Sequence, residues 1–145
     1  MKKIVSIVTI LMIFSILITG CSKAFDMNES VKELKELGLV EGEIYNAEKL
    51  HDTNELANSQ IKAMGGNFTV EIVKQYSLTD KSDSTMACNF LTFKTAEQAT
   101  NFADIFVKTF AKDGNPNNWK FAHSDRVVIF TNIEGVLEVI DLEFK

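Results

Sequence analysis

The clearest pattern along the chain is a helix expected over residues 95–112, where apolar residues recur at steps of three and four. Thr95 and Gln98 fit a capping box, in which their side chains satisfy free backbone amides at the helix start, and Gly114 ends the pattern. The apolar face consists of Ala99, Phe102, Ala103, Phe106 and Phe110. We expect this face to cover a sheet, with its three phenylalanines largely buried.

Two β-hairpins are expected, one on each side of this helix. Residues 67–77 and 85–93 are rich in β-branched and aromatic residues and are joined by a polar loop, which predicts the first hairpin. Residues 119–122 and 127–131 predict the second in the same way.

The N-terminal part of the domain is less regular. A short helix is expected from Asn28 to a cap at Gly38, and another from Asn54 to a stop at Gly65. Residues 39–52 contain apolar positions without a clean period, so no element is predicted there.

The C-terminal segment, residues 132–144, fits either of two elements. Its apolar spacing suits a helix, which we favour, but its β-branched residues could also alternate as a strand. The predicted fold is one α+β domain over residues 28–145, with a two-layer core. About four antiparallel strands pack against helices in the order β-β-α-β-β-α, preceded by one or two helices.

The first 20 residues have the pattern of a secretory signal. Lys2 and Lys3 precede an apolar run over residues 4–18, and the small residue Gly20 stands where cleavage would occur. A permanent transmembrane helix is the alternative, but the run is shorter than the roughly 20 residues needed to span a bilayer. A removable export signal is therefore the better interpretation.

Cys21 directly follows Ile18-Thr19-Gly20. This ending resembles the lipobox of bacterial lipoproteins, and the order of elements is similar to that of small lipoproteins of Gram-positive bacteria. The resemblance implies removal of residues 1–20, a diacylglyceryl group on Cys21 and attachment to the extracytoplasmic face of the cell membrane. Two acyl chains give stable anchoring.

The alternative is an ordinary secretory signal with an accidental cysteine. Residues 21–27 would form a short tether.

Charge and cysteine content exclude several classes of partner. The formal charge is −5, and it becomes −7 when Lys2 and Lys3 leave with the signal. Arg126 is the only arginine, so the clustered basic residues that bind nucleic acid are missing. With Cys21 lipidated, Cys88 has no disulfide partner in the chain, and we expect it to be a small buried hydrophobe.

No motif indicates catalysis, a metal or a cofactor. The sequence has no Gly-x-Ser-x-Gly elbow and no glycine-rich phosphate loop. An EF-hand loop starting at Asp80 would need Gly and Glu where Thr85 and Leu91 stand. His51 has acidic neighbours but too few nitrogen or sulfur ligands for zinc.

Asn117, Asn118 and Trp119 form the candidate binding surface, because a loop of asparagines beside an aromatic residue can bind sugars or a partner. The alternative is that Trp119 begins a strand and packs inward.

The predicted function is a non-catalytic binding module on the membrane. One version is a protective lipoprotein that intercepts a toxin, bacteriocin or phage component. An envelope accessory protein, or an enzyme without a recognisable motif, would also be compatible with the sequence.

Overall fold

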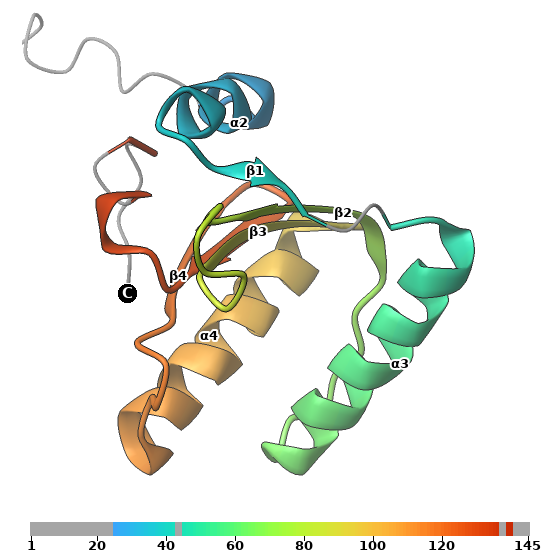
Figure 1. Ribbon diagram of the computed structural model, residues 1–145. Helices are drawn as coiled ribbons and strands as arrows, with labels where there is room; N and C mark the ends of the chain where they lie inside the picture. The colour runs from blue at the N-terminus through green and yellow to red at the C-terminus, as the bar shows by residue number, and fades with distance from the viewer. Residues whose placement is uncertain (1–24, 43–44, 137–138, 141–145) are drawn as a thin grey trace, which may run out of the picture.

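The computed structural model describes residues 25–42, 45–136 and 139–140 (Figure 1). The expected signal segment and Cys21 lie outside this part of the chain. The described residues form an antiparallel sheet with helices, so the predicted α+β class is confirmed. The elements are α2 (Met27–Glu36), β1 (Val40–Glu41), α3 (Ala47–Ala63), β2 (Ile72–Thr79), β3 (Ala87–Phe93), α4 (Ala96–Asp113), β4 (Lys120–Ser124), β5 (Val127–Thr131) and the 3-10 helix η1 (Glu134–Val136).

The strands lie in the order β1-β2-β3-β5-β4, with every neighbouring pair antiparallel. Both predicted hairpins are present, as β2–β3 and β4–β5. Helix α4 carries the chain past the position of β5 to the sheet edge, where β4 forms the outer strand. Figure 1 shows α3 and α4 on one side of the sheet and α2 on the other.

The described sheet has five strands where about four were predicted. The additional strand is β1, in which Val40 pairs with Thr79 and Glu41 with Leu78. The segment 39–52 thus contains this short strand and the first turn of α3. Asn46 caps that turn, accepting a hydrogen bond from the Lys49 amide at 2.9 Å, so α3 starts well before the predicted Asn54.

Helix boundaries differ from the predictions at both ends of the domain. Asp26 caps α2 by accepting from the amides of Asn28 and Glu29, so the end of the expected tether already belongs to the helix. At the C-terminus, the described residues contain only the short η1 where a longer helix was favoured. Much of segment 132–144 lies outside the described residues.

Two asparagines of α3 determine where β2 begins. Asn58 donates to the Val70 carbonyl at 3.0 Å and accepts from the Val70 amide at 2.8 Å. Asn54 makes the same pair of bonds with Ile72, at 2.9 and 2.6 Å. These side chains occupy backbone groups that a neighbouring strand would otherwise use. The strand predicted over 67–77 therefore starts at Ile72.

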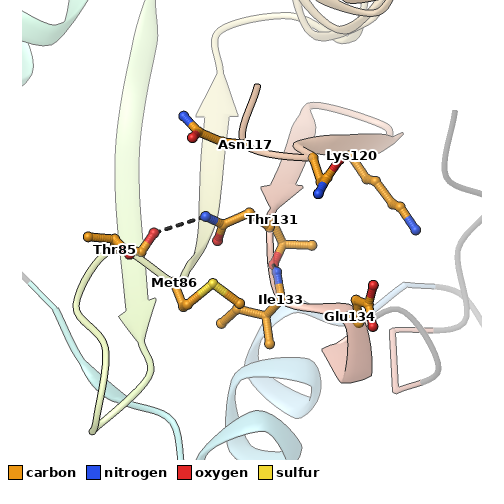
Figure 2. Close-up of a pocket in the computed structure, with 9 residues that line it drawn as sticks. Thr85, Met86, Asn117, Lys120, Thr131, Ile133 and Glu134 are labelled. Carbon is orange, nitrogen blue, oxygen red and sulfur yellow. Dashed lines mark hydrogen bonds between the residues drawn. The ribbon is translucent and has the colours of Figure 1, made fainter. Parts of the chain in front are cut away.

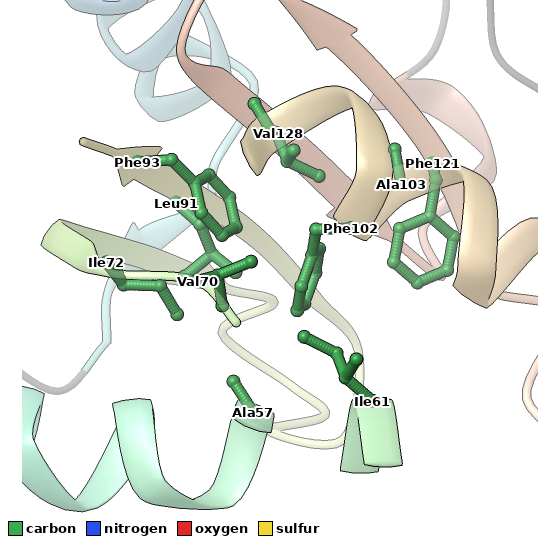
Figure 3. Packing of buried hydrophobic residues seen from close by; sticks show 11 residues of the cluster. Ala57, Ile61, Val70, Ile72, Leu91, Phe93, Phe102, Ala103, Phe121 and Val128 are labelled. Carbon is green, nitrogen blue, oxygen red and sulfur yellow. The ribbon is translucent and has the colours of Figure 1, made fainter. Parts of the chain in front are cut away.

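Alternating side chains divide the core between the two faces of the sheet. The face under α3 and α4 is covered by a cluster that includes Phe93, Phe102 and Val128 (Figure 3). The opposite face holds a second cluster of buried residues: Leu34, Leu39, Leu78, Cys88, Phe90, Ile129, Val136 and Ile140.

The phenylalanines of α4 face the sheet, as predicted, but to different depths. Phe102 is 5% exposed, whereas Phe106 and Phe110 are only partly buried. Both of these rings lie against Phe121, with centroids 5.5 and 5.7 Å away. Phe121 belongs to the edge strand β4, so this end of α4 packs against the margin of the sheet. Phe102 is thus buried as expected, and Phe106 and Phe110 are partly buried against the same cluster.

Candidate functional site

A groove of about 630 Å³ lies where β3 and β4 begin and β5 ends (Figure 2). Three segments that are distant in sequence contribute to it: the loop before β3, the loop before β4, and the end of β5 with the residues that follow. The groove is lined by Thr85, Met86, Asn117, Asn118, Lys120, Thr131, Asn132, Ile133 and Glu134. It contains both asparagines of the predicted binding surface.

Asn132 holds the groove together from one side. Its amide nitrogen donates to the Thr85 carbonyl at 2.9 Å, and its oxygen accepts from the Ala87 amide at 2.8 Å. Next to it, the Thr131 hydroxyl donates to the Ala87 carbonyl at 2.9 Å and accepts from the Ile133 amide at 3.1 Å. Both side chains continue the β3–β5 pairing past the strand ends, so their polar groups fix the shape of the groove.

Sequence reasoning missed Thr131 and Asn132 as groove residues. The sequence around Asn132 indicates only a cap for the favoured C-terminal helix, because its partners are 45 and 47 residues away. The signal that could find them is the pairing of β3 with β5. That pairing follows from the sheet order and from no local pattern.

The loop before β4 presents Asn117 and Asn118 to the groove. The Asn115 side chain fixes this loop, donating to the Trp119 carbonyl at 2.5 Å and accepting from the Trp119 amide at 2.9 Å. Asn118 has a φ of 54°, a left-handed conformation that asparagine tolerates better than most residues. Among the described residues, Asn117 and Asn118 have no side-chain hydrogen bond, and both are exposed. Their amides are thus available to a ligand.

Trp119 is separated from the two asparagines. Its ring lies 5.4 Å from that of Phe130 and lines a different depression of about 250 Å³, together with Phe110 and Phe121. Successive residues entering a strand point to opposite faces, so Trp119 is directed toward the side of α4. Trp119 therefore packs inward, as the alternative interpretation expects. It does not line the groove that contains Asn117 and Asn118.

Charged and apolar side chains also line the groove. Lys120 and Glu134 are both exposed at its rim, and the side chains of Met86 and Ile133 lie together on its floor (Figure 2). The lining thus offers one cation, one anion and several amide groups that donate and accept hydrogen bonds. This combination suits a polar ligand without a large net charge.

Cys88 is an inert thiol in this arrangement. It is completely buried within the second core cluster, as predicted for a small hydrophobe. Burial raises the pKa of the Cys88 thiol to about 12, against the smaller lowering effect of its hydrogen bond with Thr131. A thiol of this kind remains protonated at neutral pH and is a poor nucleophile.

The remaining polar positions form local contacts. His51 is exposed on α3, with its Nε2 atom 3.5 Å from the Glu55 carboxylate. Hydrogen bonds from Ser82 to Asp80, and from Thr85 to Asp83, lower the pKa of each carboxyl. Within the described ranges, no three His, Cys, Asp or Glu side chains come together as a metal site.

The described part of the chain contains no helix that is both long and apolar enough to cross a membrane. Comparisons with protein-family models, with curated proteins and with solved structures found no match to this chain.

Proposed function

We propose that this chain is a membrane-anchored extracytoplasmic lipoprotein whose folded domain binds a ligand or partner without catalysing a reaction. The anchor is supported by the basic start, the short apolar run and Cys21 after Ile18-Thr19-Gly20. Phe25, the first described residue, is four residues beyond Cys21. An extended chain of that length spans at most about 14 Å. The domain would therefore lie close to the bilayer.

The groove with Asn117 and Asn118 is the observation that carries the binding role. A pre-formed concave site with convergent polar groups is the usual form of a ligand site. Its free polar groups are amides, an ammonium and a carboxylate, which are suited to recognition by hydrogen bonds.

The hydroxyls of the groove support a role without covalent catalysis. The Thr131 hydroxyl donates to the Ala87 carbonyl, and the Thr85 hydroxyl donates to the Asp83 carboxylate at 2.6 Å. A catalytic nucleophile would require an adjacent general base such as histidine. Neither histidine lines this groove.

Site-specific photo-crosslinking in membranes of the producing cells tests the binding role. A crosslinking residue at position 117 should give a defined adduct on the full chain. The matched control replaces Lys62, which is exposed on α3 and outside the groove. We expect no corresponding adduct there.

A second variant shows whether the adduct depends on the groove. Asn118→Gly removes the amide but keeps the left-handed backbone, which glycine adopts readily. We expect the position-117 adduct to weaken in this background. Equal adducts from positions 117 and 62, or no adduct from position 117, would contradict the proposal.

A further inference from the structure

We infer that the groove binds a neutral α-amino acid in its zwitterionic form, with the ligand's carboxylate at Lys120 and its ammonium at Glu134. This inference rests on the proposed binding role and names its ligand class. Among the described residues that line the groove, only Lys120 and Glu134 carry a charge, and both are exposed. Neither has an ion-pair partner in the part of the chain that the structure describes, so both charges are available to a ligand.

The backbone holds these two charges on one side of the groove. Lys120 is the first residue of β4 and pairs with Thr131, the last residue of β5. Glu134 is the first residue of η1 and follows Thr131 closely in the chain. Figure 2 shows both charged side chains on one side, with Asn117 and Thr85 on the other. Because β4 is paired with β5, both backbone positions are set before a ligand arrives.

The pair of opposite charges selects a zwitterion. A purely anionic ligand would be attracted by Lys120 and repelled by Glu134, and the reverse holds for a cation. A free α-amino acid carries its ammonium and its carboxylate on the same carbon atom, so it can contact both residues at once. Hydrogen bonds between ionised groups are shorter and stronger than those between neutral groups, which favours this mode of binding.

The rest of the groove defines the side chain of that amino acid. Asn117 and Asn118 are exposed, and each of their amides can both donate and accept a hydrogen bond. The side chains of Met86 and Ile133 form an apolar floor (Figure 2). A side chain with methylene groups and a terminal amide, as in glutamine, matches both surfaces.

L-glutamine, N-acetyl-L-glutamine and L-glutaminamide form a matched set of probes. The acetyl group removes the ammonium charge and the second amide removes the carboxylate, while the side chain is unchanged. Isothermal titration calorimetry measures their affinities for the full chain purified in detergent, in slightly acidic buffer that keeps the amine of L-glutaminamide protonated. We expect saturable binding of L-glutamine about tenfold tighter than that of either analogue, the effect of losing one hydrogen bond to a charged group.

Two variants separate the roles of the charges. Lys120→Met should abolish the preference for L-glutamine over L-glutaminamide and keep the preference over N-acetyl-L-glutamine. Glu134→Gln should have the opposite effect. Lys62→Met, on α3 and outside the groove, should leave all three affinities unchanged.

Equal binding of the three probes, no saturable binding of L-glutamine, or the same change of preference in Lys120→Met and Glu134→Gln would each overturn the inference. The crosslinking experiment at position 117 distinguishes this failure from failure of the binding role. An adduct there without L-glutamine binding overturns the ligand class alone, whereas the absence of both overturns the groove as a binding site.

Discussion

At the scale of single residues, Cys88 provides a test of how tightly the second core cluster is packed. Because its side chain is completely buried, a thiol reagent can reach it only when the domain opens. We expect slow labelling of Cys88 in native buffer and rapid, complete labelling in denaturant, followed by mass spectrometry. Labelling at the same rate in both conditions would show that the cluster is open.

The raised pKa of Cys88 also predicts a dependence of stability on pH. The unfolded thiol ionises near 9.0, whereas the folded thiol keeps its proton until about 12. Stability is therefore unaffected well below 9.0 and falls as pH rises between these values, because the unfolded chain releases its proton first. At pH 10 the loss should be about 1 kcal/mol.

Urea unfolding at pH 8 and pH 10 measures this effect. Cys88→Ala is the control, since it has no thiol but keeps every other titrating group of the folded domain. We expect the pH-dependent loss to be about 1 kcal/mol smaller in the variant. Identical losses in the two proteins would contradict the assigned burial.

At the scale of elements, the side chains of Asn54 and Asn58 join α3 to the start of β2. Asn58→Ala removes both hydrogen bonds to Val70 and leaves two partly buried backbone groups without partners. We expect a loss of about 2 kcal/mol in the free energy of unfolding. Asn58→Asp keeps the acceptor and loses the donor, so its loss should be smaller.

The control for this measurement is Ser59→Ala, the exposed neighbour on α3, which should change stability by less than about 0.5 kcal/mol. If Asn58→Ala has an effect as small as this control, the side-chain bonds do not hold α3 to the sheet.

The depth of each phenylalanine of α4 should set its contribution to stability. Phe102 is buried against Phe93, with ring centroids 5.0 Å apart, so Phe102→Ala should cost about 3–5 kcal/mol. Phe110 is partly exposed near the sheet edge, and Phe110→Ala should cost clearly less. Chemical denaturation measures the free energy of unfolding of both variants. Equal losses would show that α4 is buried against the sheet along its whole length.

Local patterns explain which elements could be predicted. Helix α4 has a cap at Thr95, a regular apolar face and Gly114 at its end, so each signal lies within the element. The hairpins likewise depend on neighbouring segments. Strand β1 could not be found in this way, because Val40 pairs with Thr79, which is remote in the sequence.

At the scale of the whole molecule, the candidate site depends on the order of the strands. Asn117 and Asn118 could be selected from composition, but Thr85 and Glu134 join them only because β5 inserts between β3 and β4. The same insertion brings Phe130 close to Leu91 on the face under α3 and α4. A single sequence carries no local signal for this arrangement, whereas the faces of individual strands follow from their alternation.

At this scale we propose that lipid on Cys21 holds the folded domain close to a membrane. Cys21→Ala should prevent lipid attachment and cleavage, leaving a precursor retained through residues 1–20. Immunoblotting of membrane and soluble fractions would show the larger form. A variant processed to the normal size would contradict the role of Cys21.

Lipid attachment at Cys21 can be tested directly by mass spectrometry of the N-terminal peptide from the membrane-bound protein. We expect the mature chain to begin at Cys21 and this residue to carry a diacylglyceryl group. An N-terminal peptide that retains residues 1–20, or one that begins at an unmodified Cys21, would contradict it.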